Sequence, residues 1–360
     1  MNRRFVKQFS EMGQPATFLT GTVAIILVLA VFKILSYLFV PVAFAVFLTY
    51  IFYPVISFLT KRRVPQFFAV LFVTSVVLLF AYFTSILVSA SLSSVSEKGD
   101  FYLQRLEEIL TSILTPFNYS LSEFLKLVRM QFNTNIESTI GSVLSSGVIQ
   151  QLLSALSGTF NAMIMTLLFF VFMISGKNQF DKKVKVYLSA GSAGNKPLLL
   201  TIESQIQKYL IIKTVISFIL AVLITLIYLW FGVDLAIFWG IITFVFNYIP
   251  NIGAVFSTFL PIVLILLQFG FSFEALFLIL ATVGLHFLSG NVVEPVYVGK
   301  YLDLSPVFVL FSLFLWGYIW GLPGMFLSVP IAAMIKIVFE NTEPLKKYAP
   351  FLGGKLRVDE

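Results

Sequence analysis

Long apolar segments without charged side chains dominate the pattern of hydrophobic and polar positions along the chain. Most run for about 20 residues, the length that an α-helix needs to cross the hydrocarbon core of a bilayer. Lys33 interrupts only the first segment, close enough to its end for the long side chain to carry the ammonium to the interface. The pattern predicts membrane-spanning helices over residues 21–39, 41–59, 67–89, 160–176, 214–231, 306–321 and 322–339.

The first two predicted helices meet at Pro41. Proline is favoured in the first turn of a helix, where its missing N–H would have no partner, and it moves the preceding residue, Val40, out of helical conformation. We therefore expect a tight turn at these two residues. Because a second apolar segment follows at once and no cleavage site of small residues ends the first, the sequence predicts a retained anchor and not an export signal.

Two further apolar segments, 235–249 and 254–268, are shorter than the rest. As helices of about 15 residues they would reach only about 22 Å, less than the roughly 30 Å of a hydrocarbon core. We predict a re-entrant hairpin with its tip at 247–253. Pro and Gly would end the helices there, and two Asn side chains would offer donors and acceptors. These tip residues are Asn247, Pro250, Asn251 and Gly253.

A second interruption falls in the apolar segment that begins at residue 275. Segment 275–289 supplies one more crossing, and Gly, Asn, Glu and Pro then follow within a few positions. Irregular backbone and charge at membrane depth survive only inside protein or beside a wet cavity, and paired interruptions of this kind indicate the binding site of a secondary transporter. The residues concerned are Gly290, Asn291, Glu294, Pro295 and Gly299.

These candidate residues have competing interpretations. Glu294 is predicted to contact solute or exchange protons together with Asn291, Asn247 and Asn251, but it could instead form a structural salt bridge to Lys300. His286, the only histidine, lies about two helical turns before Glu294, so both could face one cavity if the helix were continuous.

Three other positions are interpreted structurally. Asp234 follows Gly232 and Val233 at a predicted outer turn, where solvation is the ordinary role of a carboxylate. Gly317 and Gly321 form a pair of small residues that predicts close helix packing and, secondarily, an oligomer contact.

The segment 90–157 is the one sizeable region without a predicted span. Leu103, Leu106 and Leu110 recur at helical spacing, and Ser120 with Glu123 forms a capping box. We predict amphipathic helices packed on the outer face. A role as substrate-gathering arms remains an alternative that no particular residue supports.

Composition and charge narrow the class of protein. Hydrophobic residues make up 59% of the 360 residues and charged residues only 11%, which indicates lipid as the main surrounding. The net charge of +7 does not favour nucleic acid, because the cations cluster beside apolar segments, as they do on the cytoplasmic side of membrane proteins. With no Cys, a single His, and no His-Glu-x-x-His or membrane Asp pair, neither a metal site, a cofactor nor an intramembrane enzyme is expected.

The predicted fold is an all-α polytopic membrane protein of about eight spans, with the re-entrant hairpin and a small helical extracytoplasmic segment. Basic clusters and parity place both termini in the cytoplasm. The expected divisions are the cytoplasmic N-terminus 1–17, spans one to three in 18–89, the outer segment 90–157, span four in 158–176, the basic cytoplasmic segment 177–213, the transport core 214–340 and the cytoplasmic C-terminus 341–360.

The C-terminal half resembles the autoinducer-2 exporter (AI-2E) family, also described as PerM-like permeases. Residues 247–253 resemble the family's Asn-x-Ile-Pro-x-Ile-Gly element, and further matches follow in the same order over most of the chain. These matches are Gly290-Asn291, Glu294-Pro295, Gly299-Lys300, Trp316-Gly317 through Gly321, Gly324-Met325, Val329-Pro330 and Lys336. The chain departs from the family at Ala254 and Ser305, where Pro and His are frequent, and serine cannot titrate as histidine does.

The resemblance implies a bacterial inner-membrane protein that forms homo-oligomers and exports a small polar solute such as autoinducer-2. In some relatives it implies sodium/proton exchange, so H⁺ or Na⁺ is the expected coupling ion. Together with the two interruptions, it predicts a secondary transporter. A cation/proton antiporter of the same fold is the alternative, and an intramembrane enzyme or a scaffold is less favoured.

Overall fold

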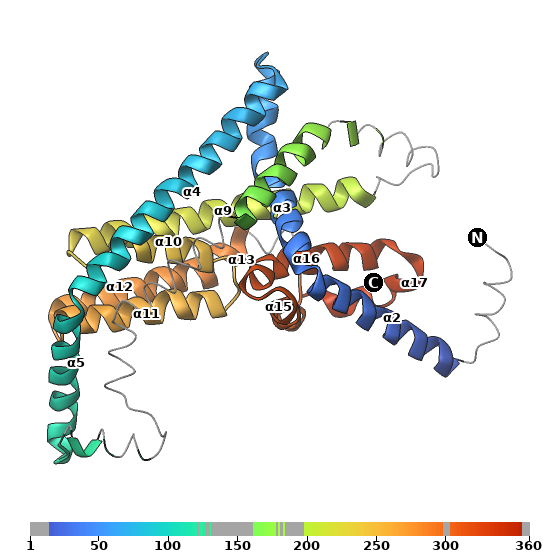
Figure 1. The fold of residues 1–360 in the computed structure, drawn as a ribbon. Coiled ribbons are helices and arrows are strands. Elements are labelled where there is room, and N and C mark those ends of the chain that lie inside the picture. The colour runs from blue at the N-terminus through green and yellow to red at the C-terminus, as the bar shows by residue number, and fades with distance from the viewer. Residues whose placement is uncertain are drawn as a thin grey trace.

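The computed structural model describes residues 14–120, 161–177, 198–297 and 303–354, with a few isolated positions between 122 and 183. Within these ranges the chain is helical, and its one β-type pairing is an isolated bridge between Leu304 and Gly353. The helices form two groups that share α9 (Figure 1). The predicted fold class, an all-α polytopic membrane protein, is confirmed.

Six of the described helices are long and apolar enough to cross a bilayer, and four shorter apolar helices accompany them. The six are Ser36–Lys61, Gln66–Ser91, Glu203–Trp230, Ile252–Phe269, Phe273–Tyr297 and Leu322–Asn341. The shorter ones are Leu19–Ile34, Asn161–Lys177, Ala236–Phe246 and Pro306–Trp320. The total of about eight crossings and the re-entrant course of the hairpin stay predictions.

The N-terminal helices α2 (Gln14–Ile34) and α3 (Ser36–Lys61) do not divide where the sequence predicts. The chain turns at Leu35, and α3 continues through Pro41. Because Pro41 lies little more than one turn inside the helix, it removes a single backbone hydrogen bond, which a buried helix tolerates. The predicted turn at Val40 is therefore wrong by several residues. Lys33, near the end of α2, places its ammonium 3.5 Å from the centre of the Tyr318 ring.

The third predicted span, 67–89, lies in a helix that continues for about two turns beyond it. Helix α4 (Gln66–Glu97) leads into α5 (Gly99–Leu114) and the short 3₁₀ helix η1 (Thr115–Phe117). The capping box is confirmed: the Ser120 N–H donates to Glu123 Oε2 at 3.1 Å, and the Glu123 N–H donates to Ser120 Oγ at 3.2 Å. The Ser120 N–H and the Ser120 hydroxyl, which also donates to Glu123 Oε2 at 3.0 Å, hold the pKa of the Glu123 carboxyl below its ordinary value.

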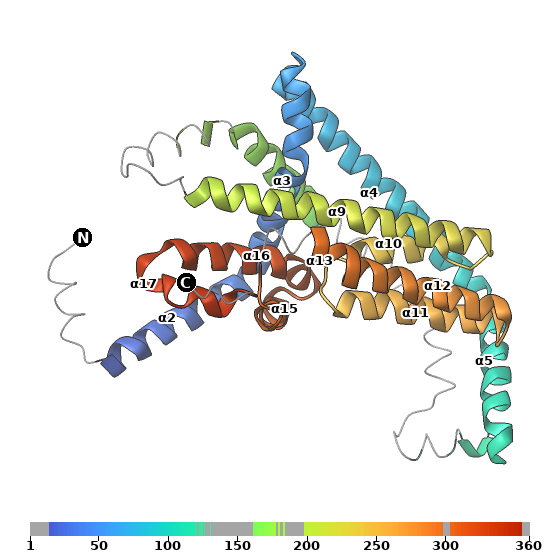
Figure 2. The same ribbon diagram turned by 180° about the vertical axis from the view of Figure 1, so that it is seen from behind.

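The central group consists of four helices that lie side by side in both ribbon views (Figures 1 and 2). They are α9 (Leu198–Trp230), α10 (Ala236–Phe246), α11 (Ile252–Phe269) and α12 (Phe273–Leu288). Helix α9 starts well before the predicted span 214–231, inside the stretch assigned by sequence to a basic cytoplasmic segment. The extra turns bring polar side chains into the core.

Helices α10 and α11 form the predicted helix–turn–helix, with the turn at Asn247–Asn251. Asn251 has a left-handed backbone (φ 57°), and Pro250 lies in the turn beside it. A Cβ on Gly253 would come within 1.8 Å of the Phe246 carbonyl oxygen, so only glycine lets the two helix ends approach this closely. The legs are unequal, because α10 has 11 residues and α11 has 18.

The second predicted interruption is not a break. Helix α12 passes through a π-helical turn, η2 (Ser289–Val293), into the short α13 (Glu294–Tyr297). Pro295 supplies the physical reason, because it has no N–H for the Asn291 carbonyl and its ring crowds that oxygen, which a wider turn relieves. Gly290 lies inside η2, so a continuous helix joins His286 to Glu294. Gly299 and Lys300 lie outside the described residues.

The C-terminal helices α15 (Pro306–Trp320) and α16 (Leu322–Asn341) form a tight pair, followed by α17 (Glu343–Lys346) and η3 (Ala349–Leu352). Gly321 makes the turn between them with φ 67°, and open space surrounds it, so its role is conformational rather than packing. Gly317 does pack closely, against the Met325 side chain. Gly324 fits more tightly still, because its Cβ would meet the Trp316 carbonyl oxygen at 1.9 Å.

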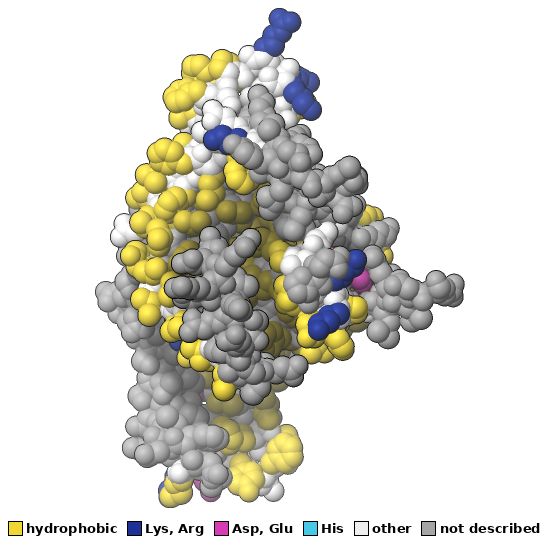
Figure 3. Space-filling view, turned by 90° about the vertical axis from the view of Figure 1, so that its right-hand side faces the viewer, with side chains coloured by type: hydrophobic (Ala, Val, Ile, Leu, Met, Phe, Trp, Pro, Cys, Tyr) yellow, Lys and Arg dark blue, Asp and Glu magenta, His cyan; other side chains and the backbone are white. Residues whose placement is uncertain are grey.

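The described surface matches a lipid environment. Figure 3 shows a broad belt of hydrophobic side chains, with Lys and Arg gathered at the upper tip and at the lower right. The upper tip corresponds to the turn between α3 and α4, where Lys61, Arg62 and Arg63 lie. Separating cations from an apolar belt in this way is typical of membrane proteins.

Candidate functional site

Helix α9 carries a row of buried polar side chains through otherwise apolar sequence. Tyr209, Lys213 and Ser217 recur at a spacing of one helical turn, so they lie on one face, and Tyr228 is buried further along the helix. Polar groups are costly to bury unless they find partners, so these residues indicate contacts to neighbouring helices.

Glu294 forms an ion pair with Lys213. Lys213 Nζ lies 2.5 Å from Glu294 Oε1, the lysine side chain is only 6% exposed, and the carboxylate is 24% exposed. Glu294 reaches α9 because it follows directly on the π turn. The partner that the structure shows is thus Lys213, whereas the structural alternative from the sequence was a salt bridge to Lys300. In an ion pair this deep, each charged group can leave its partner and bind a polar ligand instead.

The α10–α11 turn contacts the same turn of α9. Asn247 Nδ2 donates to Ser217 Oγ at 2.8 Å, and the Tyr248 hydroxyl donates to Thr214 Oγ1 at 2.7 Å. Ser217 lies one helical turn from Lys213. The two segments that the sequence singled out therefore meet on α9, one through Glu294 and the other through Asn247.

His286 contacts α11 and the preceding turn of its own helix. Its Nε2 lies 2.9 Å from Ser257 Oγ on α11, and its Nδ1 lies 3.0 Å from the Thr282 carbonyl oxygen. The Thr282 hydroxyl lies 2.8 Å from the Tyr228 hydroxyl. His286 thus joins α11 to α12 and does not contact Glu294.

An open cavity of about 400 Å³ lies beside His286, between α11 and the α12–η2 helix. Asn291 lines it and is exposed, with its amide 3.3 Å from the Phe287 carbonyl oxygen. Asn251 is exposed in the hairpin turn. The predicted residues therefore form two sets. The inner set, Glu294 and Asn247, contacts α9, and the outer set, His286, Asn291 and Asn251, does not.

Three buried polar atoms near the inner set have no hydrogen-bond partner among the described residues. They are Trp239 Nε1 and Thr243 Oγ1 on α10, and Ser289 Oγ at the start of η2. Thr243 lies one turn before Asn247, and Ser289 lies between His286 and Glu294. Buried polar atoms without protein partners are common where water or a ligand binds. In the described parts of the chain, no group of three or more His, Asp or Glu gathers to hold a metal ion.

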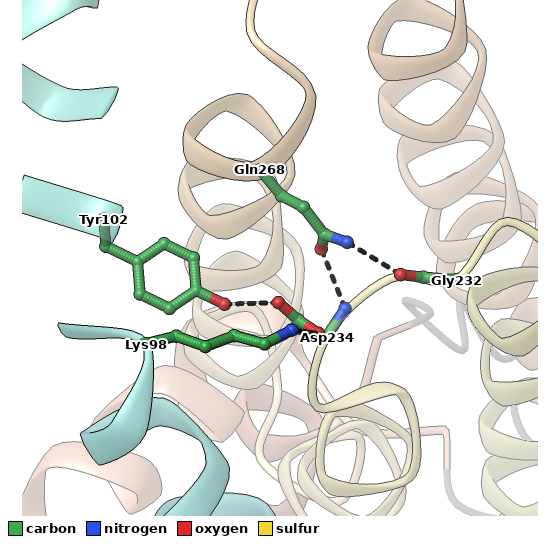
Figure 4. Close-up of polar contacts among 5 residues, drawn as sticks. All are labelled: Lys98, Tyr102, Gly232, Asp234 and Gln268. Atoms are coloured by element: carbon green, nitrogen blue, oxygen red, sulfur yellow. Dashed lines mark hydrogen bonds and ion pairs between the residues drawn. The ribbon is translucent and has the colours of Figure 1, made fainter. Parts of the chain in front are cut away.

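Asp234 is engaged, contrary to the solvated role that its turn predicts. Figure 4 shows its carboxylate between Lys98 Nζ and the Tyr102 hydroxyl, each 2.6 Å away. Its backbone N–H donates to Gln268 Oε1 at 2.8 Å, and Gln268 Nε2 donates to the Gly232 carbonyl oxygen at 2.7 Å. This cluster fastens α5 to the α9–α10 turn and to α11. Burial, with the carboxylate alongside, raises the pKa of the Tyr102 phenol well above its ordinary value.

Lys213 is the buried partner of Glu294 that sequence reasoning missed. It falls at the end of a stretch rich in basic residues, so it was grouped with cytoplasmic cations. One signal was available, because Tyr209, Lys213 and Ser217 recur at the spacing of one helix face just where the apolar segment begins. A polar face of this kind predicts a partner inside the protein.

Comparison with known proteins gives a consistent family. A family model described as AI-2E family transporter matches residues 22–343. The AI-2 transport protein TqsA of Escherichia coli (strain K12) is 29% identical over 343 residues, which cover 92% of this chain and 95% of TqsA.

Other relatives carry less specific names. A Borreliella burgdorferi protein named "Putative transport protein" is 29% identical over 338 residues, covering 92% of this chain and 89% of its own length. YhhT of Escherichia coli (strain K12), with a name of the same kind, is 32% identical over 202 residues, covering 56% of this chain and 57% of its own length.

Proposed function

The chain belongs to the AI-2E family of transporters, and we propose that it is a secondary transporter that exports a small polar solute, such as autoinducer-2, across the bacterial inner membrane. Family membership and the membrane-spanning helices support transport. The name of TqsA supports autoinducer-2 as the first solute to test. Export, rather than uptake, rests on the family resemblance.

One observation carries the proposal: both unusual segments reach the same turn of α9. The Lys213–Glu294 pair and the Asn247–Ser217 hydrogen bond lie next to one another there. A small polar solute needs donors and acceptors that replace water at membrane depth, and this place offers a cation, an anion, an amide and a hydroxyl. The Asp234 cluster gathers similar groups, but they bond one another where α5 joins the α9–α10 turn.

The ion pair gives a simple binding step. With no solute present, the ammonium and the carboxylate neutralise one another. A solute accepts hydrogen bonds from Lys213 through a hydroxyl or carbonyl oxygen and donates to Glu294 through a hydroxyl group. Both charges therefore keep a hydrogen-bond partner when the ion pair separates. Thr243 and Ser289 supply further hydroxyls on α10 and η2. Motion of the α10–α11 hairpin against α9 then exposes the solute to one side of the membrane and afterwards to the other.

The test is flux of autoinducer-2 in proteoliposomes made with purified protein. Glu294→Gln keeps the size of the side chain and removes its charge, and we expect flux to fall at least about tenfold, the equivalent of one charge-assisted hydrogen bond. Glu108→Gln is the matched control, because Glu108 is exposed on α5. Flux as high in Glu294→Gln as in Glu108→Gln would contradict a role for Glu294, and absence of flux with the unaltered protein would favour a scaffold function.

The same ion pair supports cation/proton antiport as a second candidate. A buried carboxylate that leaves its lysine can take up a proton or Na⁺ in its place. A pH-gradient dye assay with added sodium separates the candidates. Antiport predicts that sodium dissipates the gradient and that Glu294→Gln stops this, whereas export of a neutral solute leaves the gradient unchanged.

Orientation and assembly complete the proposal. Placing the cations of the α3–α4 turn in the cytoplasm puts α5 and the Asp234 cluster outside, with both termini inside. Assembly into homo-oligomers is proposed on the family resemblance. The many exposed apolar side chains of α4 offer a surface for lipid or for a second copy of the chain.

A further inference from the structure

A second cavity, of about 300 Å³, lies apart from the polar groups on α9. It forms where α2 and α3 meet α9, α15 and α16, at the centre of Figure 1. Carbon atoms make up nearly all of its wall, including the side chains of Phe32, Ala43, Phe47, Leu210 and Leu327. A polar solute finds no partners here, so this space does not belong to the proposed transport site.

One residue of the lining carries a polar atom without a partner. Trp316 is 7% exposed, and its indole Nε1 is buried without a hydrogen-bond acceptor among the described residues. The neighbouring Trp320 is different, because its Nε1 donates to the Phe32 carbonyl oxygen at 3.0 Å. The Trp316 nitrogen is covered by protein atoms and is not open to the cavity, so the space itself suits a hydrocarbon body.

Aromatic rings around Trp316 contact one another and keep the cavity open. The Trp316 and Trp320 ring centres lie 4.8 Å apart, and each lies 6.0 Å from that of Phe32. Pro330, on the facing side of α16, also lines the space. Rings held by one another cannot collapse inward without losing these contacts, and an unfilled apolar space destabilises a protein in proportion to its volume. A resident hydrocarbon would remove that cost.

The position along the helices indicates which hydrocarbon. Trp316 lies near the end of α15, and Phe32 lies near the end of α2. Ends of apolar helices lie close to the membrane interface, at the depth of lipid ester carbonyls, where Trp is enriched. Lys33 is exposed at the same end, above the Tyr318 ring, and its charge complements a phosphate headgroup.

We propose that this cavity binds one acyl chain of a membrane phospholipid, with the phosphate headgroup at the end of α2 beside Lys33. The bound acyl chain packs between the N-terminal helices, α9 and the α15–α16 pair, and it is a constant part of the folded protein. The proposal is independent of the transported solute.

Brominated phospholipids test this, because bromine on an acyl chain quenches tryptophan fluorescence only on contact. The protein has four Trp, and single-Trp variants are made by replacing the other three with Phe. Trp230, 88% exposed, reports bulk lipid, and Trp239, 8% exposed in the helix core, reports a site without lipid. In vesicles of brominated phosphatidylcholine, we expect Trp316 to be quenched nearly as much as Trp230 and several-fold more than Trp239.

A filling variant completes the experiment. Ala43→Phe occupies the cavity and should lower quenching of Trp316 to the level of Trp239 while leaving Trp230 unchanged. Val55→Phe adds the same kind of ring to the exposed surface of α3 and should change neither signal. Quenching of Trp316 no greater than that of Trp239 would overturn the proposal. So would quenching that Ala43→Phe leaves intact, because the lipid would then contact Trp316 from outside the cavity.

A single replacement keeps the test open if the triple variants do not fold. In the otherwise intact protein, Trp316→Phe should lower the quenchable fraction of the total fluorescence. An unchanged fraction contradicts the proposal.

Discussion

At the scale of residues, the ion pair between Lys213 and Glu294 has the largest expected effect on stability. Two opposite charges inside a membrane protein stabilise one another only while both are present, because either one alone is left desolvated. The lysine is the more deeply buried of the two. Its loss leaves the carboxylate some contact with the surface, whereas loss of the carboxylate leaves the ammonium fully enclosed.

Because of this asymmetry, we expect replacement of Glu294 to destabilise the protein more than replacement of Lys213. Glu294→Gln should lower the free energy of unfolding by on the order of 2–4 kcal/mol, Lys213→Met by about half as much, and the double variant by less than the sum. Thermal unfolding in detergent micelles measures this. Additive losses would show that the two side chains are not coupled in the protein.

At the scale of elements, the cluster around Asp234 holds α5 against the core. It contains an ion pair, a phenol hydrogen bond and an amide bridge, and it joins segments that are more than a hundred residues apart in the chain. Helix α5 has few other ways to attach, because Gly99 and Tyr102 are its only buried residues. The carboxylate therefore positions the outer segment.

Tyr102→Phe tests this attachment and its dependence on pH. Because the pKa of Tyr102 is raised, the phenol contributes fully below its ordinary value near 10 and is lost only as pH rises through the higher value. We expect faster amide hydrogen exchange in α5, by about three- to tenfold, and the same ratio from about pH 6 to about pH 9. Tyr119→Phe, on an exposed tyrosine, is the control. A ratio that disappears within this range would contradict the assignment.

At the scale of the whole molecule, the long helix α4 separates two regions of different charge. The turn before it carries Lys61, Arg62 and Arg63, and the helix after it carries Asp100, Glu107 and Glu108. Cations near a span face the cytoplasm, so the proposed orientation places these regions on opposite sides.

The absence of Cys makes this orientation easy to measure. In right-side-out vesicles, a membrane-impermeant thiol reagent should label Glu107→Cys and should not label Arg63→Cys until the vesicles are opened. The reverse pattern would invert the proposed topology. Labelling of both from outside would show that α4 does not span the membrane.

The sequence by itself determined the class of fold and the positions of several turns and helix caps. Apolar segments of spanning length require membrane helices, because backbone groups in lipid must be bonded within the helix. The Pro250 and Gly253 turn, the capping box at Ser120 and the helical spacing in α5 were also predictable. Each depends on residues within a few positions of one another, and propensity acts at that range.

Tertiary structure alone decided the partners. Lys213 and Glu294 are separated by 81 positions, and their contact depends on how α9 is rotated and on the added residue of the π turn, which local patterns do not encode. Helix packing also decided that α3 continues through Pro41 and that Asp234 contacts Lys98 and Tyr102. A buried polar group takes whichever partner the packing of helices brings near, since leaving it unpaired costs more than a local distortion of the backbone.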